Sequence, residues 1–358
     1  MLDPNSGGVI LKSLGYILAG AVLLGLAGLC LAGDLGLDSY HVVETYTIGG
    51  DGGWDYISID SGARRLYVSH GTRLEVVDAD TGKSLGQIGE TPGVHGAAIA
   101  PELRLGFTSN GSDNSVTIFD TMTLKTIRKV PVNHPDFILY DSFTRRVFPM
   151  DETITVLDAA SGTRVGEVDL GGDPEAAASD GKGTIYVNLA DKGAIAVVDA
   201  QTLKVTRTYG IAGCESPHSM SLDPASQRVF VGCRDGSLAV VDGRSGKIVD
   251  RSLMCSGVDA GAYDEESKLI FESCDEGVIS VIKEVLPGDY ELVETIKTQL
   301  YARTMVFDPK TRRIFLPTAD LETVATQDPQ QPFRRRVKSN SFRVLVVGLS
   351  EGSPQSKD

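Results

Sequence analysis

Residues 54–89 read WDYISID, SGARR, LYVSH, GT, RLEVVD, ADTGK and SLGQIG in succession, and this stretch decides the fold. Short runs with β-branched and aromatic residues alternate with runs that contain Gly, Asp, Ser or Thr. Such alternation is typical of short strands joined by tight turns. The stretch therefore predicts one antiparallel unit of four strands.

The same unit recurs along the chain with a period of about 40 residues. Its second strand, LYVSH, returns as GFTSN, VFPMD, IYVNL, VFVGC, LIFESC and IFLPT, and its third strand, LEVVD, as VTIFD, ITVLD, IAVVD, LAVVD and ISVIK. A repeat of this length made of strands indicates a propeller, because each unit must bury its faces against its neighbours. We predict an all-β, seven-bladed β-propeller of four-stranded blades over residues 40–348.

The motifs YVSH, FTSN and FVGC resemble the second-strand motif of the YVTN-repeat family of seven-bladed β-propellers, which is bacterial and secreted. The resemblance covers roughly residues 40–348 and implies this fold. It implies no particular activity, since members of one fold carry unrelated functions.

The last repeat lacks a fourth strand. It offers ARTMVFD, RIFLPT and, after a long insertion, FRVLVVG. Residues 40–48 have alternating strand character and precede the first repeat, so they can supply the missing strand. We expect this N-terminal strand to complete the last blade and close the ring, which protects the exposed sheet edges of an open array.

The N-terminus predicts export. Residues 14–32 are nearly continuously apolar and follow Lys12, as in a signal peptide, and they are long enough to span a bilayer. We therefore assign residues 1–33 to a cleaved signal peptide or an uncleaved signal anchor. The expected location is periplasmic or extracellular, with membrane contact only through this segment. Residues 349–358 have the composition of a disordered tail.

Four cysteines in the repeats support an oxidising compartment. Cys214 and Cys233 are 19 residues apart, as are Cys255 and Cys274, and both pairs occupy equivalent places in consecutive repeats. One member precedes the first strand and the other ends the second, and these positions meet in an antiparallel pair. We predict two disulfides within blades. The alternative, a four-thiolate metal site, lacks the usual CxxC spacing.

The charge of the chain narrows the range of partners. The formal net charge is −14, so nucleic acid would be repelled on average and is not an expected partner. The insertion at residues 319–340 contains a basic run, Arg334, Arg335, Arg336 and Lys338. We interpret it as a solvated loop, with a loop that docks a partner as the alternative. We expect the protein to be a monomer.

One position of the repeat is ionisable in every unit. The residues follow one another at intervals of 39 to 44 positions at the start of each first strand: Asp55, His95, Asp136, Glu175, His218, Asp259 and Arg303. First strands line the channel of a propeller, so we expect these side chains to converge on one end of it, here called the channel mouth. The simplest interpretation is a set of polar groups solvated by channel water. The alternative is a ligand site made of all seven.

The residue types favour a ligand site that holds positive charge. Four carboxylates around one opening repel each other unless a cation, bound protons or Arg303 compensates them. Imidazole together with carboxylate suits a divalent transition metal, which makes His95, His218, Asp136 and Glu175 the candidate metal ligands. Arg303 could instead bind a carboxylate or phosphate of a substrate. The implied cofactor is at most one divalent metal ion.

Two classes of function remain. The first is an exported binding or scaffold propeller that holds a small molecule, a metal or a protein partner at its channel mouth. The second is a metal-assisted hydrolase or lyase of the lactonase kind, using the same residues. The sequence contains no serine nucleophile elbow, phosphate loop or dinucleotide fingerprint, so it does not decide whether the protein is an enzyme.

Overall fold

The computed structural model describes residues 39–325 and 333–349. The expected signal segment at residues 1–33 and nearly all of the expected tail lie outside this range. Within the described residues, none of the helices is long and apolar enough to cross a membrane.

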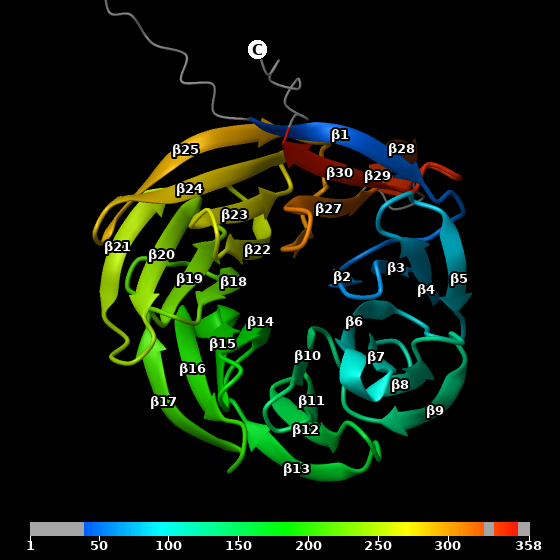
Figure 1. Ribbon diagram of the computed structural model, residues 1–358, viewed down its shortest axis with the longest axis horizontal. Helices are drawn as coiled ribbons and strands as arrows, with labels where there is room; N and C mark the ends of the chain where they lie inside the picture. Colours follow the sequence, from blue (N-terminus) through cyan, green and yellow to red (C-terminus); the bar gives the residue numbers. More distant parts are fainter. Residues whose placement is uncertain (1–38, 326–332, 350–358) are drawn as a thin grey trace, which may run out of the picture. The chain divides into compact units, whose positions relative to one another are not determined.

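Seven antiparallel sheets of four strands stand in a ring, as predicted (Figure 1). Six of these blades are built from consecutive strands, paired in the order of the sequence. Blade 1 consists of β2 (Ile57–Asp60), β3 (Arg65–His70), β4 (Arg73–Asp78) and β5 (Ser84–Ile88). Blade 2 consists of β6 (Val94–Ala100), β7 (Leu105–Asn110), β8 (Ser115–Asp120) and β9 (Thr126–Pro131). Blade 3 consists of β10 (Ile138–Asp141), β11 (Arg146–Pro149), β12 (Thr153–Asp158) and β13 (Arg164–Asp169). Blade 4 consists of β14 (Pro174–Ser179), β15 (Thr184–Leu189), β16 (Ala194–Asp199) and β17 (Lys204–Gly210). Blade 5 consists of β18 (Pro217–Asp223), β19 (Arg228–Cys233), β20 (Ser237–Asp242) and β21 (Ile248–Leu253). Blade 6 consists of β22 (Val258–Asp264), β23 (Leu269–Cys274), β24 (Val278–Leu286) and β25 (Asp289–Lys297).

Blade 7 combines the two ends of the described chain. Its strands are β26 (Val306–Asp308), β27 (Arg313–Thr318), β30 (Arg343–Leu349) and β1 (Tyr40–Thr47). The outer strand β1 pairs antiparallel with β30, from Tyr40 opposite Leu349 to Thr47 opposite Arg343. Two short 3-10 helices, η1 (Pro101–Leu103) and η2 (Ala190–Lys192), complete the elements of the ring.

The insertion of blade 7 is more ordered than the sequence indicated. Strands β28 (Leu321–Ala325) and β29 (Phe333–Val337) pair antiparallel between β27 and β30. These residues therefore form a hairpin where a loop was expected, and most of their side chains are exposed to solvent, as expected. A cross-strand ion pair between Arg336 and Glu322, 2.5 Å from nitrogen to oxygen, supports the pairing.

The hydrophobic core consists of clusters between neighbouring blades. One cluster joins Phe148 and Val156 of blade 3 to Val187 of blade 4, and corresponding clusters join the other neighbours. Another joins blade 7 to blade 1 through Phe315 and Leu66. The middle strands are buried on both faces for this reason, which accounts for their nearly continuous apolar sequences.

Both predicted disulfides are present. Cys214 is bonded to Cys233 in blade 5, with the Cα atoms 5.4 Å apart. Cys255 is bonded to Cys274 in blade 6, with the Cα atoms 6.1 Å apart. All four sulfur atoms are used, so the alternative of a four-thiolate metal site is excluded.

Candidate site at one end of the central channel

Each blade contributes its ionisable residue from the start of its first strand. Strands β2, β6, β10, β14, β18 and β22 lie innermost around the central opening (Figure 1). Each of the seven residues lies just before its first strand or within that strand's first two positions. The side chains make contacts with one another in three groups, each contributed by different blades.

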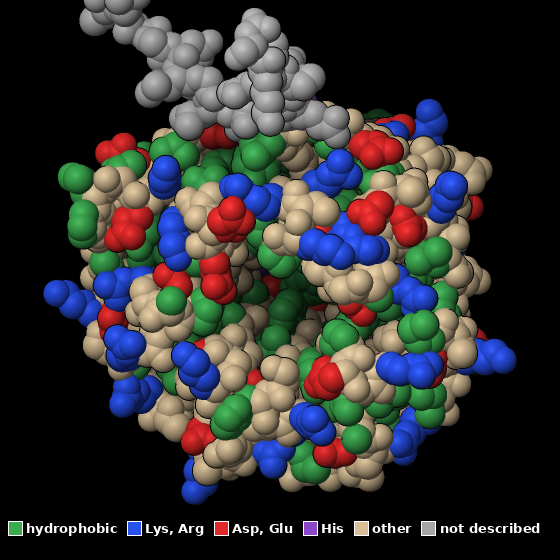
Figure 2. All heavy atoms as spheres, viewed as in Figure 1, with side chains coloured by type: hydrophobic (Ala, Val, Ile, Leu, Met, Phe, Trp, Pro, Cys, Tyr) green, Lys and Arg blue, Asp and Glu red, His purple; other side chains and the backbone are tan. Residues whose placement is uncertain are grey.

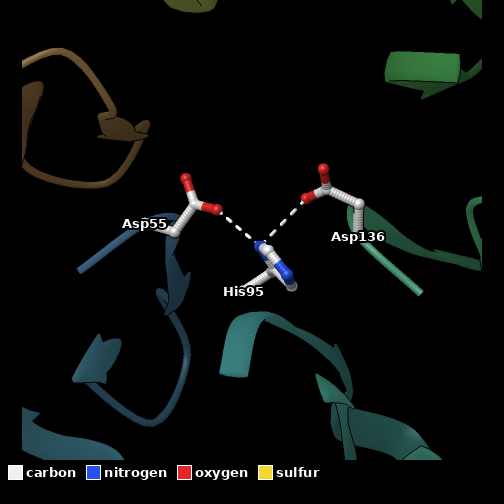
Figure 3. Close-up of side chains that lie close together, drawn as sticks. All are labelled: Asp55, His95 and Asp136. Atoms are coloured by element: carbon white, nitrogen blue, oxygen red, sulfur yellow. Dashed lines mark hydrogen bonds and ion pairs between the residues drawn. The ribbon is translucent and has the colours of Figure 1, made fainter. Parts of the chain in front are cut away.

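The first group contains Asp55, His95 and Asp136, from blades 1, 2 and 3 (Figure 3). His95 Nδ1 is 2.8 Å from Asp55 Oδ2 and 3.2 Å from Asp136 Oδ1. One ligand atom of each residue lies within 4.8 Å of the other two. We call these three residues the Asp–His–Asp group.

Several contacts hold the Asp–His–Asp group in place. Gly111 makes room for the imidazole, because a Cβ atom there would lie 2.6 Å from His95 Nε2. The backbone of Asp55 donates a hydrogen bond to Ser69 Oγ, and its carbonyl accepts one from the hydroxyl of Thr304 in blade 7. The group is therefore supported by residues of blades 1, 2 and 7.

The other four residues form two pairs. His218 Nε2 lies 3.4 Å from Glu175 Oε1, across blades 4 and 5. Arg303 Nε lies 3.0 Å from Asp259 Oδ2, across blades 6 and 7. Of the four metal ligands expected from the sequence, the structure thus groups His95 and Asp136 with Asp55, and it places His218 and Glu175 in a separate pair.

Arg234 belongs to the channel mouth and was missed by the sequence analysis. It directly follows β19, and its Nη1 lies 3.1 Å from His218 Nε2. Its guanidinium charge also opposes the rise in the pKa of Glu175 and of Asp259. The available signal was its position directly after Cys233, which is predicted to end a second strand.

Burial and mutual repulsion shift the carboxyl groups toward the protonated form. Burial, followed by the charges of Asp136 and Asp259, raises the pKa of Glu175 to about 7. Burial raises the pKa of Asp259 to about 6 in spite of Arg303. Burial also raises the pKa of Asp136. The channel mouth therefore holds more negative charge than its own cations compensate.

The two histidines differ in charge. A hydrogen bond to Asp55 raises the pKa of His95, so this imidazole is more readily protonated than usual. Burial and the charge of Arg234 lower the pKa of His218 to about 4, so this imidazole is neutral at pH 7. The carboxylates around His95 thus favour a positive charge on it, whereas the guanidinium group of Arg234 disfavours one on His218.

A cavity of about 250 Å³ lies inside the channel, next to the ionisable residues of the repeat. It is bounded by residues next to the ring positions, including Tyr56, Phe137, Met220 and Met305, and by Asp259. The rings of Tyr56 and Phe137 meet edge to face, 5.2 Å between centroids. The channel appears in the space-filling view as a central hollow with hydrophobic side chains inside (Figure 2).

Comparison with known proteins supports the fold. No protein-family model and no curated protein matches this chain, so the resemblance to the YVTN-repeat family stays a prediction. Among solved structures, a chain of hydrazine synthase from Kuenenia stuttgartiensis is similar, with a TM-score of 0.65 and 15% sequence identity. The similarity covers 76% of this chain and 94% of that one. At this identity it bears on the propeller fold alone.

Proposed function

We propose that this protein is an exported binding propeller that holds a divalent transition-metal ion on Asp55, His95 and Asp136. The observation that carries the proposal is the approach of three ligand atoms from three separate blades to one point. One imidazole nitrogen and two carboxylate oxygens form a donor set that suits such ions.

The spacing of the ligand atoms fits metal coordination. Neighbouring ligand atoms in an octahedral site with bonds of about 2.1 Å lie about 3.0 Å apart. The two distances from His95 Nδ1, 2.8 and 3.2 Å, are close to this value. Asp136 Oδ1 is buried and accepts no hydrogen bond from the described residues. Its contact with His95 Nδ1 is an ion pair without a hydrogen bond, and a cation between the three residues would give this oxygen a direct ligand bond.

The charge of the channel mouth supports the same proposal. A divalent cation would offset the repulsion among Asp55, Asp136, Glu175 and Asp259, which, after burial, contributes to the raised pKa values of the last three. It would also replace the proton on His95 Nδ1. The two disulfides support a periplasmic or extracellular location, because such bonds persist in oxidising compartments.

A second candidate function is a metal-assisted hydrolase or lyase. It is favoured by Glu175, a carboxyl group with a pKa of about 7 at the same channel mouth, since a general acid or base works best near the operating pH. Metal-dependent hydrolysis of simple lactones that is abolished by Glu175→Gln, with metal binding retained, would favour this candidate over pure binding.

Calorimetric titration of the purified protein with Mn²⁺ and Zn²⁺ tests the proposed cation site. We expect one site per chain, and a loss of affinity of at least about tenfold in His95→Ala and in Asp136→Asn. His41→Ala is the matched control, because His41 is exposed on β1. Affinity in the wild type should fall from pH 8 to pH 6, because protons compete for His95, whose pKa is raised.

The other histidine of the ring sharpens the test. His218→Ala should leave the affinity near that of the wild type, because His218 is paired with Glu175 and Arg234 and not with the Asp–His–Asp group. A loss in His218→Ala alone would place the cation on that pair instead. Equal affinities in wild type, His95→Ala and Asp136→Asn would contradict the proposed site.

A further inference from the structure

Two guanidinium groups, those of Arg234 and Arg303, lie at the channel mouth outside the Asp–His–Asp group. We propose that Arg234 and Arg303 bind the carboxylate of a small organic acid whose apolar body enters the channel cavity. This inference deepens the proposed function and rests on it in treating the channel mouth as a binding site. It adds the chemical class of the ligand and a residue, Arg234, that the repeat does not indicate.

Arg234 is held through one nitrogen of its guanidinium group, and the rest of the group makes no hydrogen bond to the described residues. His218 Nδ1 lies 3.3 Å from the carbonyl oxygen of Ser216, so this nitrogen carries the proton and Nε2 accepts from Arg234 Nη1. The other side-chain nitrogen atoms of Arg234 donate to no acceptor within hydrogen-bond distance among residues 39–325 and 333–349. The neutral imidazole thus positions the guanidinium group without cancelling its charge.

Arg303 is held in a similar way. Its Nε approaches Asp259 Oδ2 at 3.0 Å, and its two terminal nitrogen atoms have no acceptor in the described part of the chain. The side chain of Arg303 is 38% exposed, whereas that of Asp259 is 11% exposed. Part of the Arg303 side chain is therefore accessible to a ligand. A planar pair of N–H groups of this kind matches the two oxygens of a carboxylate.

The two arginines act on the same part of the mouth. Arg234 belongs to blade 5 and Arg303 to the chain entering blade 7, so they flank blade 6, on the far side of the ring from blade 2 (Figure 1). Both guanidinium charges act to lower the pKa of Asp259 and the pKa of His218. With a divalent cation on the Asp–His–Asp group, four positive charges would match the four ring carboxylates. An arriving carboxylate would then meet no excess of negative charge.

The cavity limits the size and polarity of the ligand. Phe137, Met220 and Met305 give it an apolar wall, and Asp259 lies at its boundary. Its volume of about 250 Å³ lies just below the range of about 300–1,000 Å³ usual for small-molecule sites. The ligand we expect is therefore a carboxylate with one ring or a short alkyl chain.

Binding of benzoate, measured by calorimetry with and without MnCl2, tests this inference. Benzylamine and benzamide are the matched probes, because they keep the ring and replace the carboxylate by a cation or a neutral amide. We expect the wild type to bind benzoate more tightly than both. Arg234→Gln and Arg303→Gln should each weaken benzoate binding by about tenfold or more. Arg244→Gln, an exposed arginine of the same blade as Arg234, should bind as the wild type does.

The outcomes separate this inference from the cation site. Benzoate binding that depends on both arginines while Mn²⁺ fails to bind would overturn the cation site and leave the inference standing. Mn²⁺ binding with no benzoate binding at millimolar concentrations would overturn the inference alone. Tighter binding of benzylamine than of benzoate by the wild type would also overturn it, whatever the variants show.

Discussion

Glu272 shows how one residue can depart from the repeat. Its side chain is fully buried on β23, at a position that Val68, Val231 and Leu316 occupy in other blades. Ser219 Oγ donates a hydrogen bond of 2.5 Å to one carboxyl oxygen, and the other oxygen has no partner among the described residues. Gly261 makes room for the group, because a Cβ atom there would lie 2.7 Å from Glu272 Oε1.

The burial of Glu272 predicts a pH-dependent stability. Burial raises its pKa to about 8, above the value of the unfolded chain, so the folded protein holds a proton that the unfolded chain releases. The free energy of unfolding should therefore decrease as the pH rises from about 4.5 to about 8. Glu272→Gln, which resembles the protonated acid, should match the wild type at pH 4 and exceed it at pH 9 by a few kcal/mol, at about 1.4 kcal/mol per pKa unit.

Denaturant unfolding at these two pH values measures the difference. Glu276→Gln is the control, since Glu276 is exposed in the same blade and its removal should not change the pH dependence. A constant difference between wild type and Glu272→Gln across the pH range would show that Glu272 does not ionise on unfolding.

At the scale of strands, the disulfides connect the entry of a blade to the end of its second strand. Cys233 ends β19 and precedes Arg234, and Cys255 precedes the strand that carries Asp259. Each bond thus anchors a segment that bears a residue of the channel mouth. Their equivalent positions in blades 5 and 6 follow from the same repeat that placed the seven ionisable residues.

Removing either disulfide should lower stability by a similar amount. Both bonds close loops of equal length, with a sequence separation of 19, and chain entropy assigns about 3 kcal/mol to a loop of this size. We expect Cys214→Ser/Cys233→Ser and Cys255→Ser/Cys274→Ser to shift the unfolding midpoint downward to a comparable extent. Denaturant titration under oxidising conditions measures this. An unchanged midpoint in either double variant would contradict the entropic account.

At the scale of the whole molecule, β1 contacts both neighbours of blade 7. Tyr40 packs edge to face against Phe271 of blade 6, 5.2 Å between ring centroids. The hydroxyl of Tyr46 donates to the carbonyl of Ala79 in blade 1 at 3.1 Å, and its ring belongs to the cluster between blades 7 and 1. Strand β1 therefore links three blades in addition to pairing with β30.

Deleting residues 40–47 should open the ring. The deletion removes the outer strand of blade 7 and exposes β30 as an edge, so we expect a large loss of soluble protein or of the cooperative unfolding transition. Removal of residues 350–358 is the control and should change little. Expression yield, size-exclusion chromatography and thermal melting measure both. Comparable behaviour of the two deletions would refute the closing role of β1.

The sequence alone determined the features that repeat. Strand patterns, turn residues and the 40-residue period are local, so they indicated seven four-stranded blades, the place of β1 beside the last strand and both disulfides. The same period identified seven equivalent positions at the channel mouth. The sequence could not assign partners among them, because one spacing describes all seven equally. Only the tertiary structure joined Asp55, His95 and Asp136, separated His218 by pairing it with Arg234, and buried Glu272 behind Gly261. These contacts depend on distances between blades and on burial, which set the charge of each group and are not properties of any one repeat.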